Sequence, residues 1–279
     1  MKILRTCEEM RKWRTSRAPH ETVGFVPTMG ALHEGHLSLL RRSKTQCVLT
    51  VVSIFVNPLQ FGPKEDFAQY PKTDEKDCEL LEREQVDVLF FPAQKEIYPS
   101  DFSTTVSEDQ VSQGLCGSFR PGHFRGVATV VLKLFNLVQP DTAYFGQKDY
   151  QQCAVIEKTV KDLCVPIEIV RCETLREPDG LAMSSRNRYL SSEEREKARL
   201  IYGSLQAILQ AYEKGERETR KLVEIGEALL LGKGFEIQYF NICHPKTLQK
   251  LGTIGSDGAV VALAAYLGKT RLIDNCVLI

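Results

Sequence analysis

The amino-acid sequence predicts an α/β fold, with a Rossmann-like parallel sheet that carries helices on both faces and a smaller α+β domain after it. Over the first two-thirds of the 279 residues, short apolar runs alternate with longer amphipathic stretches. This is the βαβα pattern of a parallel sheet covered by helices. After about residue 175 the pattern changes to a polar segment, charged helical stretches and three late β-rich runs. We therefore expect two domains, residues 1–174 and residues 175–279.

The elements of the parallel sheet follow one another in a regular order. The expected strands are residues 22–26, 48–56, 86–91, 142–145 and 166–172. The helices expected between them are residues 36–44, 73–84, 127–138 and 150–163. Pro140 follows the third of these helices and marks its end, because proline disrupts a helix interior.

The second domain begins with a polar linker, residues 176–192, which contains Pro178 and Gly180. A charged helical stretch follows at residues 193–214, and a second helix comes after it. The β-rich runs at residues 235–243, 259–267 and 270–279 have short glycine-containing links. Such links indicate a small antiparallel sheet.

Composition limits the classes of function. Lys plus Arg number 36 and Asp plus Glu number 36, so the formal net charge is zero. A protein that binds nucleic acid usually carries a basic surplus, because neutralising phosphates supplies much of its affinity. We therefore expect no nucleic-acid partner. The 43% hydrophobic and 26% charged residues are typical of a folded globular protein.

Location is predicted from what the sequence lacks. Its longest strongly apolar run, residues 48–56, is interrupted by Thr50 and Ser53 and falls far short of the roughly 20 residues of a membrane helix. The N-terminus becomes charged after two apolar residues, unlike a secretory signal. We expect a cytoplasmic protein with no membrane contact. The nine cysteines include no C-x-x-C pair, so we expect buried thiols and no zinc or redox motif.

The first candidate site follows the first strand and opens the first helix. It contains Met29, Gly30, Ala31, Leu32, His33, Glu34, Gly35 and His36. Helix N-termini at the carboxyl ends of parallel strands present unpaired N–H groups and favour anions. His33 and His36 share a face of the first turn, and each imidazole can donate a hydrogen bond to a phosphate oxygen. Zinc is an alternative for such a pair, but the spacing differs from H-E-x-x-H and no third ligand is evident.

Two further clusters have the same phosphate-binding character. The second follows the strand at 142–145 and contains Gly146, Gln147, Lys148, Asp149 and, one helical turn on, Gln152. Lys148 can meet a phosphate as a point charge. The third lies in the polar linker and consists of Met183, Ser184, Ser185, Arg186 and Asn187, whose hydroxyls and guanidinium can wrap a polyphosphate. Together the three clusters predict a nucleotide held between a sheet and a mobile lid.

The H-x-G-H passage and the later Ser-rich basic loop resemble the nucleotidyltransferase superfamily of the class I aminoacyl-tRNA synthetases. Longer strings, in order, resemble the pantothenate synthetase (pantoate-β-alanine ligase) family. The strings are PTMGALHEGH, SIFVNPLQFGPKEDFAQYPKT, FRPGHFRGVATVVLKLFNLVQPDTAYFGQKDYQQ, REPDGLAMSSRNRYL and GKTRLIDN.

The resemblance implies that pantoate and MgATP form pantoyl adenylate and pyrophosphate, after which β-alanine displaces AMP to give pantothenate. It assigns ATP binding to residues 29–36, 146–149 and 183–186 and to the backbone at Leu175. It assigns pantoate to Gln60 and Gln152, with Gln60 also at the β-alanine position. The catalytic roles fall to His36, His33 and Lys148. A nucleotide- and pantoate-binding first domain, a C-terminal lid and a homodimer are also implied.

The chemistry agrees with this assignment. Pantoate is already a carboxylate near pH 7, so its attack on the α-phosphorus requires no catalytic base. The protein must instead align the substrates and stabilise the leaving pyrophosphate. Mg²⁺ would arrive with the substrate phosphates and requires no protein cage. The sequence itself contains no predicted metal site.

The sequence leaves alternative functions open. Another small-carboxylate adenylyltransferase would share the two histidines, and a catalytically silent nucleotide-binding protein would share the fold. A tRNA-charging enzyme is disfavoured by the neutral charge.

Cys243 and His244 stand where the family more often has an acidic residue. We interpret His123, which lies in a matching segment, as loop structure or a dimer contact.

Overall fold

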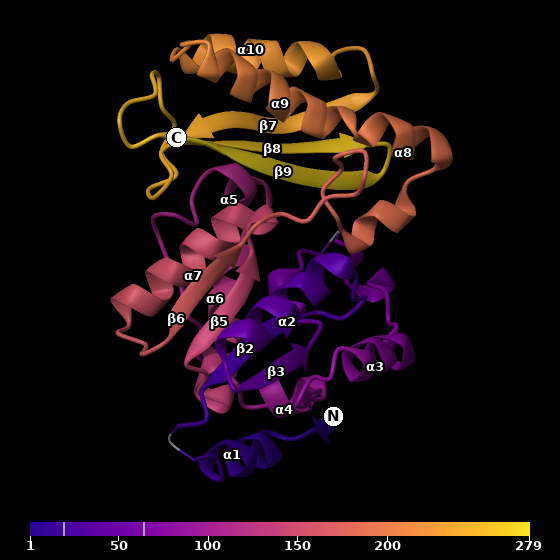
Figure 1. Cartoon of the computed structure of the whole chain (residues 1–279), viewed down its shortest axis with the longest axis vertical. Coiled ribbons are helices and arrows are strands. Elements are labelled where there is room, and N and C mark those ends of the chain that lie inside the picture. The colour runs from indigo at the N-terminus through magenta and orange to yellow at the C-terminus, as the bar shows by residue number, and fades with distance from the viewer. Residues whose placement is uncertain (19, 64) are drawn as a thin grey trace. The chain divides into compact units, whose positions relative to one another are not determined.

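The computed structural model describes residues 1–18, 20–63 and 65–279 (Figure 1). The chain divides into two compact units. Unit 1 consists of Met1–Glu108, Arg120–Gln147 and Val155–Glu173, and unit 2 of Asp109–Phe119, Lys148–Ala154 and Thr174–Ile279. The domain boundary at residue 174 stays a prediction.

Unit 1 is built on a parallel sheet of six strands in the order β1-β4-β3-β2-β5-β6. The strands are β1 (Lys2–Leu4), β2 (Val23–Thr28), β3 (Leu49–Ile54), β4 (Val88–Phe90), β5 (Thr142–Gly146) and β6 (Glu168–Cys172). The predicted α/β class is confirmed. The edge strand β1 was not predicted, because three residues are too few to show a periodic pattern.

The helices of unit 1 lie on both faces of this sheet, as predicted. They are α1 (Cys7–Thr15), α2 (Glu34–Gln46), α3 (Asp74–Arg83), α4 (Gln94–Ile97) and α6 (His123–Val138), with α7 (Tyr150–Asp162) running through both units. Successive side chains of a strand point to opposite faces. Val26 of β2 packs in one cluster with Leu40 of α2 and Leu81 of α3. The adjacent Phe25 instead meets Phe135 of α6 edge-on, with ring centroids 6.3 Å apart.

The connections place a switch point between β2 and β5. From β2 the chain passes through α2 to β3 on one side, whereas from β5 it passes through α7 to β6 on the other. The two strands are direct neighbours, with Gly24 opposite Thr142 and Phe25 opposite Ala143. In open α/β sheets ligands bind at the carboxyl ends of strands at such a point.

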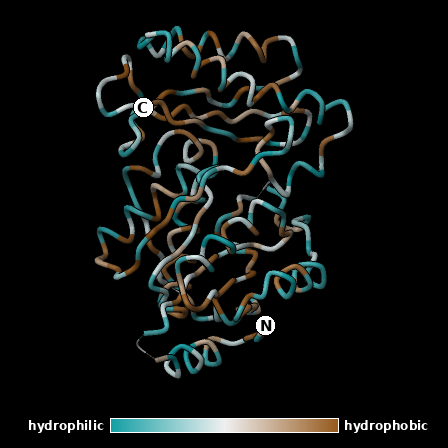
Figure 2. The backbone as a smooth tube through the Cα atoms, viewed as in Figure 1, coloured by the Kyte–Doolittle hydropathy of each residue, from teal (hydrophilic) through white to brown (hydrophobic). Residues whose placement is uncertain are grey.

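Unit 2 contains the predicted antiparallel sheet, in the order β7-β8-β9. Its strands are β7 (Phe235–Cys243), β8 (Ala259–Leu267) and β9 (Thr270–Leu278), and its helices include α5 (Leu115–Phe119), α8 (Ser192–Ala198), α9 (Leu200–Glu213) and α10 (Thr219–Leu230). The sheet packs against α9 and α10 through buried residues that include Ile208, Leu222 and Leu263. Apolar residues concentrate along the strands of both sheets (Figure 2).

One expected helix is divided in the structure. The stretch at 193–214 forms α8 and α9, and Arg199 ends the first and precedes the second with φ −59° and ψ −21°. Its dihedral angles are close to helical, which explains why the sequence pattern shows no break. In the described part of the chain, no helix has the length and apolarity needed to cross a bilayer.

Candidate functional site

The turn after β2 has an unusual backbone. Gly30 has φ +82° and Ala31 has φ +51°. An L-residue with a Cβ pays about 1–2 kcal/mol in the left-handed region. Ala31 is only 1% exposed, so its N–H also needs a partner inside the protein.

Asp77 of α3 supplies that partner. Its Oδ2 accepts a hydrogen bond from the Ala31 N–H (2.8 Å), and its Oδ1 accepts one from the Leu32 N–H (2.9 Å). The Thr73 hydroxyl donates to Oδ2 at 3.0 Å. The carboxylate is 1% exposed and thus holds the turn from within the fold. Sequence reasoning missed Asp77, because an acid in the first turn of a helix is ordinary.

His33 and His36 are brought together at the start of α2. The His33 side chain caps the helix and accepts from the Gly35 N–H at 3.1 Å, and His36 Nδ1 accepts from the His33 N–H at 3.4 Å. Their ring centroids are 4.1 Å apart. A neutral imidazole that accepts at Nδ1 carries its proton on Nε2. Both rings can therefore donate from Nε2 to a phosphate oxygen.

Gln60 lies in the short 3-10 helix Pro58–Gln60 and is 8% exposed. Its Nε2 is 3.1 Å from the Met29 sulfur, and its Oε1 accepts from Asn57 Nδ2 at 3.0 Å. The Tyr98 hydroxyl donates to Asn57 Oδ1 at 2.8 Å, and burial raises the pKa of Tyr98, which keeps this donor protonated. The structure thus joins Gln60 to residues 29–36 within unit 1.

His123 and Arg120 hold the main chain of Gln60. The Gln60 carbonyl lies 2.8 Å from His123 Nδ1 and 3.2 Å from Arg120 Nη2. Arg120 also pairs with Glu65, through contacts of 2.6 and 2.7 Å. Burial acts to raise the pKa of Glu65, but the hydrogen bonds and charge of Arg120 outweigh it, and the pKa is lowered. The interpretation of His123 as loop structure is wrong, because it is the first residue of α6 and lies, 8% exposed, against Gln60. The dimer contact stays a prediction.

The second cluster begins at the end of β5. Gly146 and Gln147 belong to unit 1, and Lys148, Asp149 and Gln152 to unit 2. Lys148 is half-buried and its carbonyl accepts from Asn275 Nδ2 at 2.9 Å. The neighbouring Gln151 is 7% exposed, and its amide is bonded to main-chain groups of residues 111–116. Gln152 is half-buried, so it is better placed than Gln151 to meet a ligand.

The third cluster is presented by a hairpin. The Leu175 carbonyl accepts from the Met183 N–H at 3.0 Å, and Arg176 forms an antiparallel bridge with Ala182. Ser184 caps the 3-10 helix Ser185–Tyr189 by accepting from the Arg186 N–H at 3.3 Å. These contacts hold the segment against the hairpin. Its ordering by nucleotide stays a prediction.

The predicted residues therefore form two groups. Unit 1 holds residues 29–36, Gln60, Gly146 and Gln147. Unit 2 holds Lys148, Asp149, Gln152, Leu175 and residues 183–186. The pairing of Gln60 with Gln152 on one pantoate stays a prediction, because the two lie in different units.

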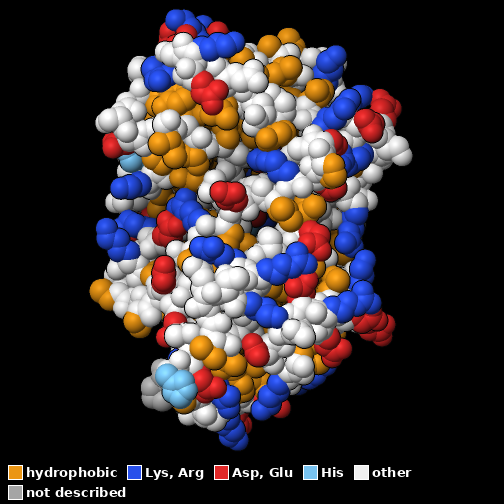
Figure 3. Space-filling model, viewed as in Figure 1, with side chains coloured by type: hydrophobic (Ala, Val, Ile, Leu, Met, Phe, Trp, Pro, Cys, Tyr) orange, Lys and Arg blue, Asp and Glu red, His pale blue; other side chains and the backbone are white. Residues whose placement is uncertain are grey.

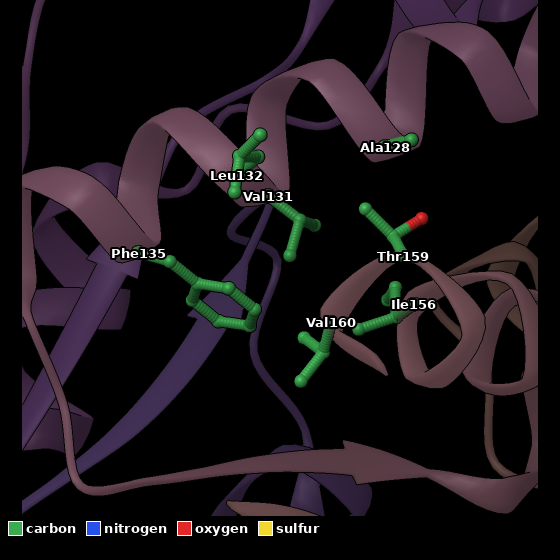
Figure 4. A pocket seen from close by; sticks show the side chains of 7 residues that line it. All are labelled: Ala128, Val131, Leu132, Phe135, Ile156, Thr159 and Val160. Carbon is green, nitrogen blue, oxygen red and sulfur yellow. The ribbon is translucent and has the colours of Figure 1, made fainter. Parts of the chain in front are cut away.

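A separate pocket between α6 and α7 does not fit the chemistry (Figure 4). Its lining is Ala128, Val131, Leu132, Phe135, Ile156, Thr159 and Val160. Thr159, the one polar lining residue, donates its hydroxyl to the Val155 carbonyl at 2.8 Å. The lining offers no charged group for a carboxylate or a phosphate. Elsewhere on the face shown in Figure 3, basic and acidic side chains are interspersed, in keeping with zero net charge.

Comparison with known proteins gives one consistent result. A profile of the pantoate-β-alanine ligase family matches residues 2–277. A relative named pantothenate synthetase from Thermotoga petrophila is 51% identical over 280 residues, with 100% of both chains covered. Another of that name, from Caldicellulosiruptor saccharolyticus, is 54% identical over 259 residues, with 92% of both chains covered.

Solved structures are similar over the same length. Pantothenate synthetase from Thermus thermophilus has a TM-score of 0.94 and 46% identity, with 99% of both chains covered. The pantoate-β-alanine ligase from Francisella tularensis, complexed with β,γ-ATP and β-alanine, has a TM-score of 0.83 and 38% identity. Here 99% of this chain and 97% of the other are covered.

Proposed function

The chain belongs to the pantoate-β-alanine ligase family, and from this we propose that it condenses pantoate with β-alanine to give pantothenate, at the expense of ATP. The reaction proceeds through a pantoyl adenylate and releases AMP and pyrophosphate. The observation that carries the proposal is the family match over residues 2–277, which includes every predicted site residue.

In the first step the pantoate carboxylate attacks the α-phosphorus of ATP and pyrophosphate leaves. We assign the phosphates to the start of α2, where the Nε2 protons of His33 and His36 provide donors and the positive end of the helix dipole favours anions. The hydrogen bonds from these donors would strengthen as negative charge develops on the leaving pyrophosphate. Lys148, Ser184, Ser185 and Arg186 add hydroxyls and positive charge from unit 2.

Gln60 and Gln152 are the residues we assign to pantoate. Asn57 accepts from Tyr98 and donates to the side-chain oxygen of Gln60, which fixes the orientation of that amide. The Gln60 amide nitrogen is thereby available as a donor beside Met29. In the second step the neutral amine of β-alanine attacks the adenylate and displaces AMP. We assign Gln60 to the β-alanine position as well.

Mg²⁺ enters this scheme with ATP. Across residues 1–18, 20–63 and 65–279 there is no group of three or more His, Cys, Asp or Glu side chains able to hold a metal. We propose that the ion is held by phosphate oxygens and water, which is how Mg²⁺ commonly binds with nucleotides. When bound, the ion would neutralise phosphate charge. We further propose that the protein is cytoplasmic and forms a homodimer, the assembly that the resemblance to the family implies.

Exchange of labelled pyrophosphate into ATP tests the first step without β-alanine. We expect exchange with MgATP that depends on pantoate. A folded, ATP-binding protein that shows none with pantoate would reject this half-reaction and favour a different carboxylate or a silent nucleotide-binding protein. Screening other small hydroxy acids in the same assay separates those two.

The His36→Ala variant tests the assignment at α2. We expect pantoate-dependent exchange to fall about 100-fold, the size of a lost donor to developing charge, while the melting temperature changes by only a few degrees. Near-normal exchange combined with a collapsed melting temperature would make His36 structural.

A further inference from the structure

The edge strand β9 contains two adjacent buried polar residues to which the proposed reaction gives no role. Asp274 and Asn275 are 3% and 4% exposed and lie in the sequence GKTRLIDN. Burying a carboxylate or an amide costs free energy unless it is hydrogen-bonded. Because successive residues of a strand point to opposite faces, the two side chains reach different parts of unit 2.

Asp274 holds Arg176 at the base of the hairpin. Its two oxygens accept from the Arg176 guanidinium at 2.6 and 3.0 Å. The guanidinium also donates to the Gly180 carbonyl at 3.0 Å and lies 4.2 Å from the centre of the Tyr202 ring. Gly180 has φ +92°, and a Cβ there would come within 2.0 Å of Tyr202. The hairpin is therefore fixed to β9 and α9 at its base and its turn.

The fixed hairpin determines where its last residues lie. The Glu177 N–H donates to the Leu181 carbonyl at 2.8 Å, and the Met183 N–H donates to the Leu175 carbonyl at 3.0 Å. Asn187 Nδ2 then donates to the Ala182 carbonyl at 3.0 Å, which ties the following 3-10 helix to the hairpin. Displacement of Arg176 would thus move residues 183–186.

Asn275 holds the other polar segment of unit 2. Its Nδ2 donates to the Lys148 carbonyl at 2.9 Å, 127 residues away in the chain. The Asn275 main-chain N–H donates to Asp274 Oδ1 at 2.8 Å, so the carboxylate that binds Arg176 also fixes the residue that binds Lys148.

We propose that Asp274 and Asn275 are positioning residues which set Lys148 and residues 183–186 at the spacing needed to bind the phosphates of ATP. The inference rests on the proposed function in one respect, the assignment of these segments to ATP. Neither residue needs to touch the nucleotide, because each acts through the segment that it holds.

The test is Asn275→Asp, which keeps the shape and loses the amide donor. The matched control is Thr270→Val, which is nearly isosteric, lies on the same strand and alters a residue that is 5% exposed. Direct binding of ATP is measured by calorimetry at pH 8 and pH 6, together with the KM for ATP, the KM for pantoate and the melting temperature.

At pH 8 we expect Asn275→Asp to weaken ATP binding about tenfold, the effect of one lost positioned hydrogen bond. The KM for pantoate and all constants of Thr270→Val should stay within twofold of wild type. At pH 6 the defect relative to wild type should shrink, because protonation of the introduced carboxyl group restores a donor and the neighbouring Asp274 favours that protonation. Because the introduced carboxylate also repels the phosphates at pH 8, Asn275→Leu, which removes the donor without adding charge, should weaken ATP binding to a similar extent at both pH values.

Several outcomes would overturn the inference. They are ATP binding within twofold of wild type at pH 8, equal weakening of ATP and pantoate with a lowered melting temperature, a defect that does not shrink at pH 6, and the same defect in Thr270→Val. If wild type binds ATP but shows no pantoate-dependent exchange, the proposed function fails, and the ATP affinities alone decide the positioning role. If wild type does not bind ATP, both are rejected.

Discussion

Asp77 offers a sharp test of how the turn after β2 is held. Replacing it with alanine leaves the N–H groups of Ala31 and Leu32, on residues 1% and 5% exposed, without their acceptor. A buried N–H that loses its partner costs about 1–3 kcal/mol, so two of them cost about 4 kcal/mol. Asp77→Asn keeps one acceptor oxygen, and we expect about half that cost.

These free energies convert to melting temperatures. For a domain of this size, 1 kcal/mol shifts the melting temperature by about 2–4 °C. We expect a decrease of about 8–16 °C for Asp77→Ala and about 4–8 °C for Asp77→Asn. The matched control is Asp74→Asn, in the same first turn of α3 but exposed, where loss of the favourable helix-dipole interaction costs about 0.3–1 kcal/mol.

Thermal unfolding followed by circular dichroism measures all three variants, and calorimetry gives their ATP affinities. The reasoning is wrong if Asp77→Asn and Asp74→Asn lower the melting temperature equally. It is also wrong if Asp77→Ala is no less stable than Asp77→Asn, because the two N–H groups would then not depend on the carboxylate.

Three further measurements address other parts of the chain. A Cβ at Gly126 would lie 2.3 Å from the Leu59 carbonyl oxygen and 2.7 Å from the Gln60 nitrogen, so Gly126→Ala should displace Gln60 and raise the KM for pantoate at least tenfold, more than that for ATP; equal changes would contradict this. Despite burial, Arg120 lowers the pKa of Glu65, so the pair stabilises the folded state above the unfolded pKa of about 4.5 and loses this contribution as pH falls through the lower folded pKa. Melting curves from pH 6 to pH 3 should therefore fall less steeply for Glu65→Gln, and identical slopes would refute this reading. Burial raises the pKa of Cys276 to about 12, so mass spectrometry after iodoacetamide at pH 8 should find exposed Cys164 alkylated and Cys276 unmodified; rapid modification of Cys276 in folded protein would argue against its burial.

The elements that the sequence predicted are those whose secondary structure follows from the pattern of their own residues. Strands β2 and β3 are almost continuous apolar runs because both faces of a parallel sheet are covered, and this pattern is visible without knowledge of the neighbours. The late strands were predicted from β-rich runs joined by short glycine-containing links. The strand β1 was missed because its three residues are defined by pairing with β4, more than 80 residues away.

The candidate site likewise contains residues that the local sequence predicts and residues whose roles depend on distant contacts. The turn from β2 into α2 was evident from its position, and the roles of Gln60 and Gln152 came from resemblance alone. The supports of the site were missed, because Asp77 and its partner Ala31 are 46 residues apart, and Asn275 and Lys148 are 127 apart. Nothing in the local pattern of an Asp or Asn reveals a hydrogen bond at such a separation.

Two buried carboxylates perform a similar task in the two units, Asp77 for the turn after β2 and Asp274 for the hairpin. An acid near bound ATP repels the phosphates by simple electrostatics, so removing either negative charge should strengthen ATP binding if charge were its main effect. If each carboxylate acts by holding protein donors in place, its replacement by Asn, which keeps the shape, should weaken ATP binding instead. The sign of the change in ATP affinity for Asp77→Asn and Asp274→Asn therefore separates the two effects, and tighter binding in both variants would refute the positioning role.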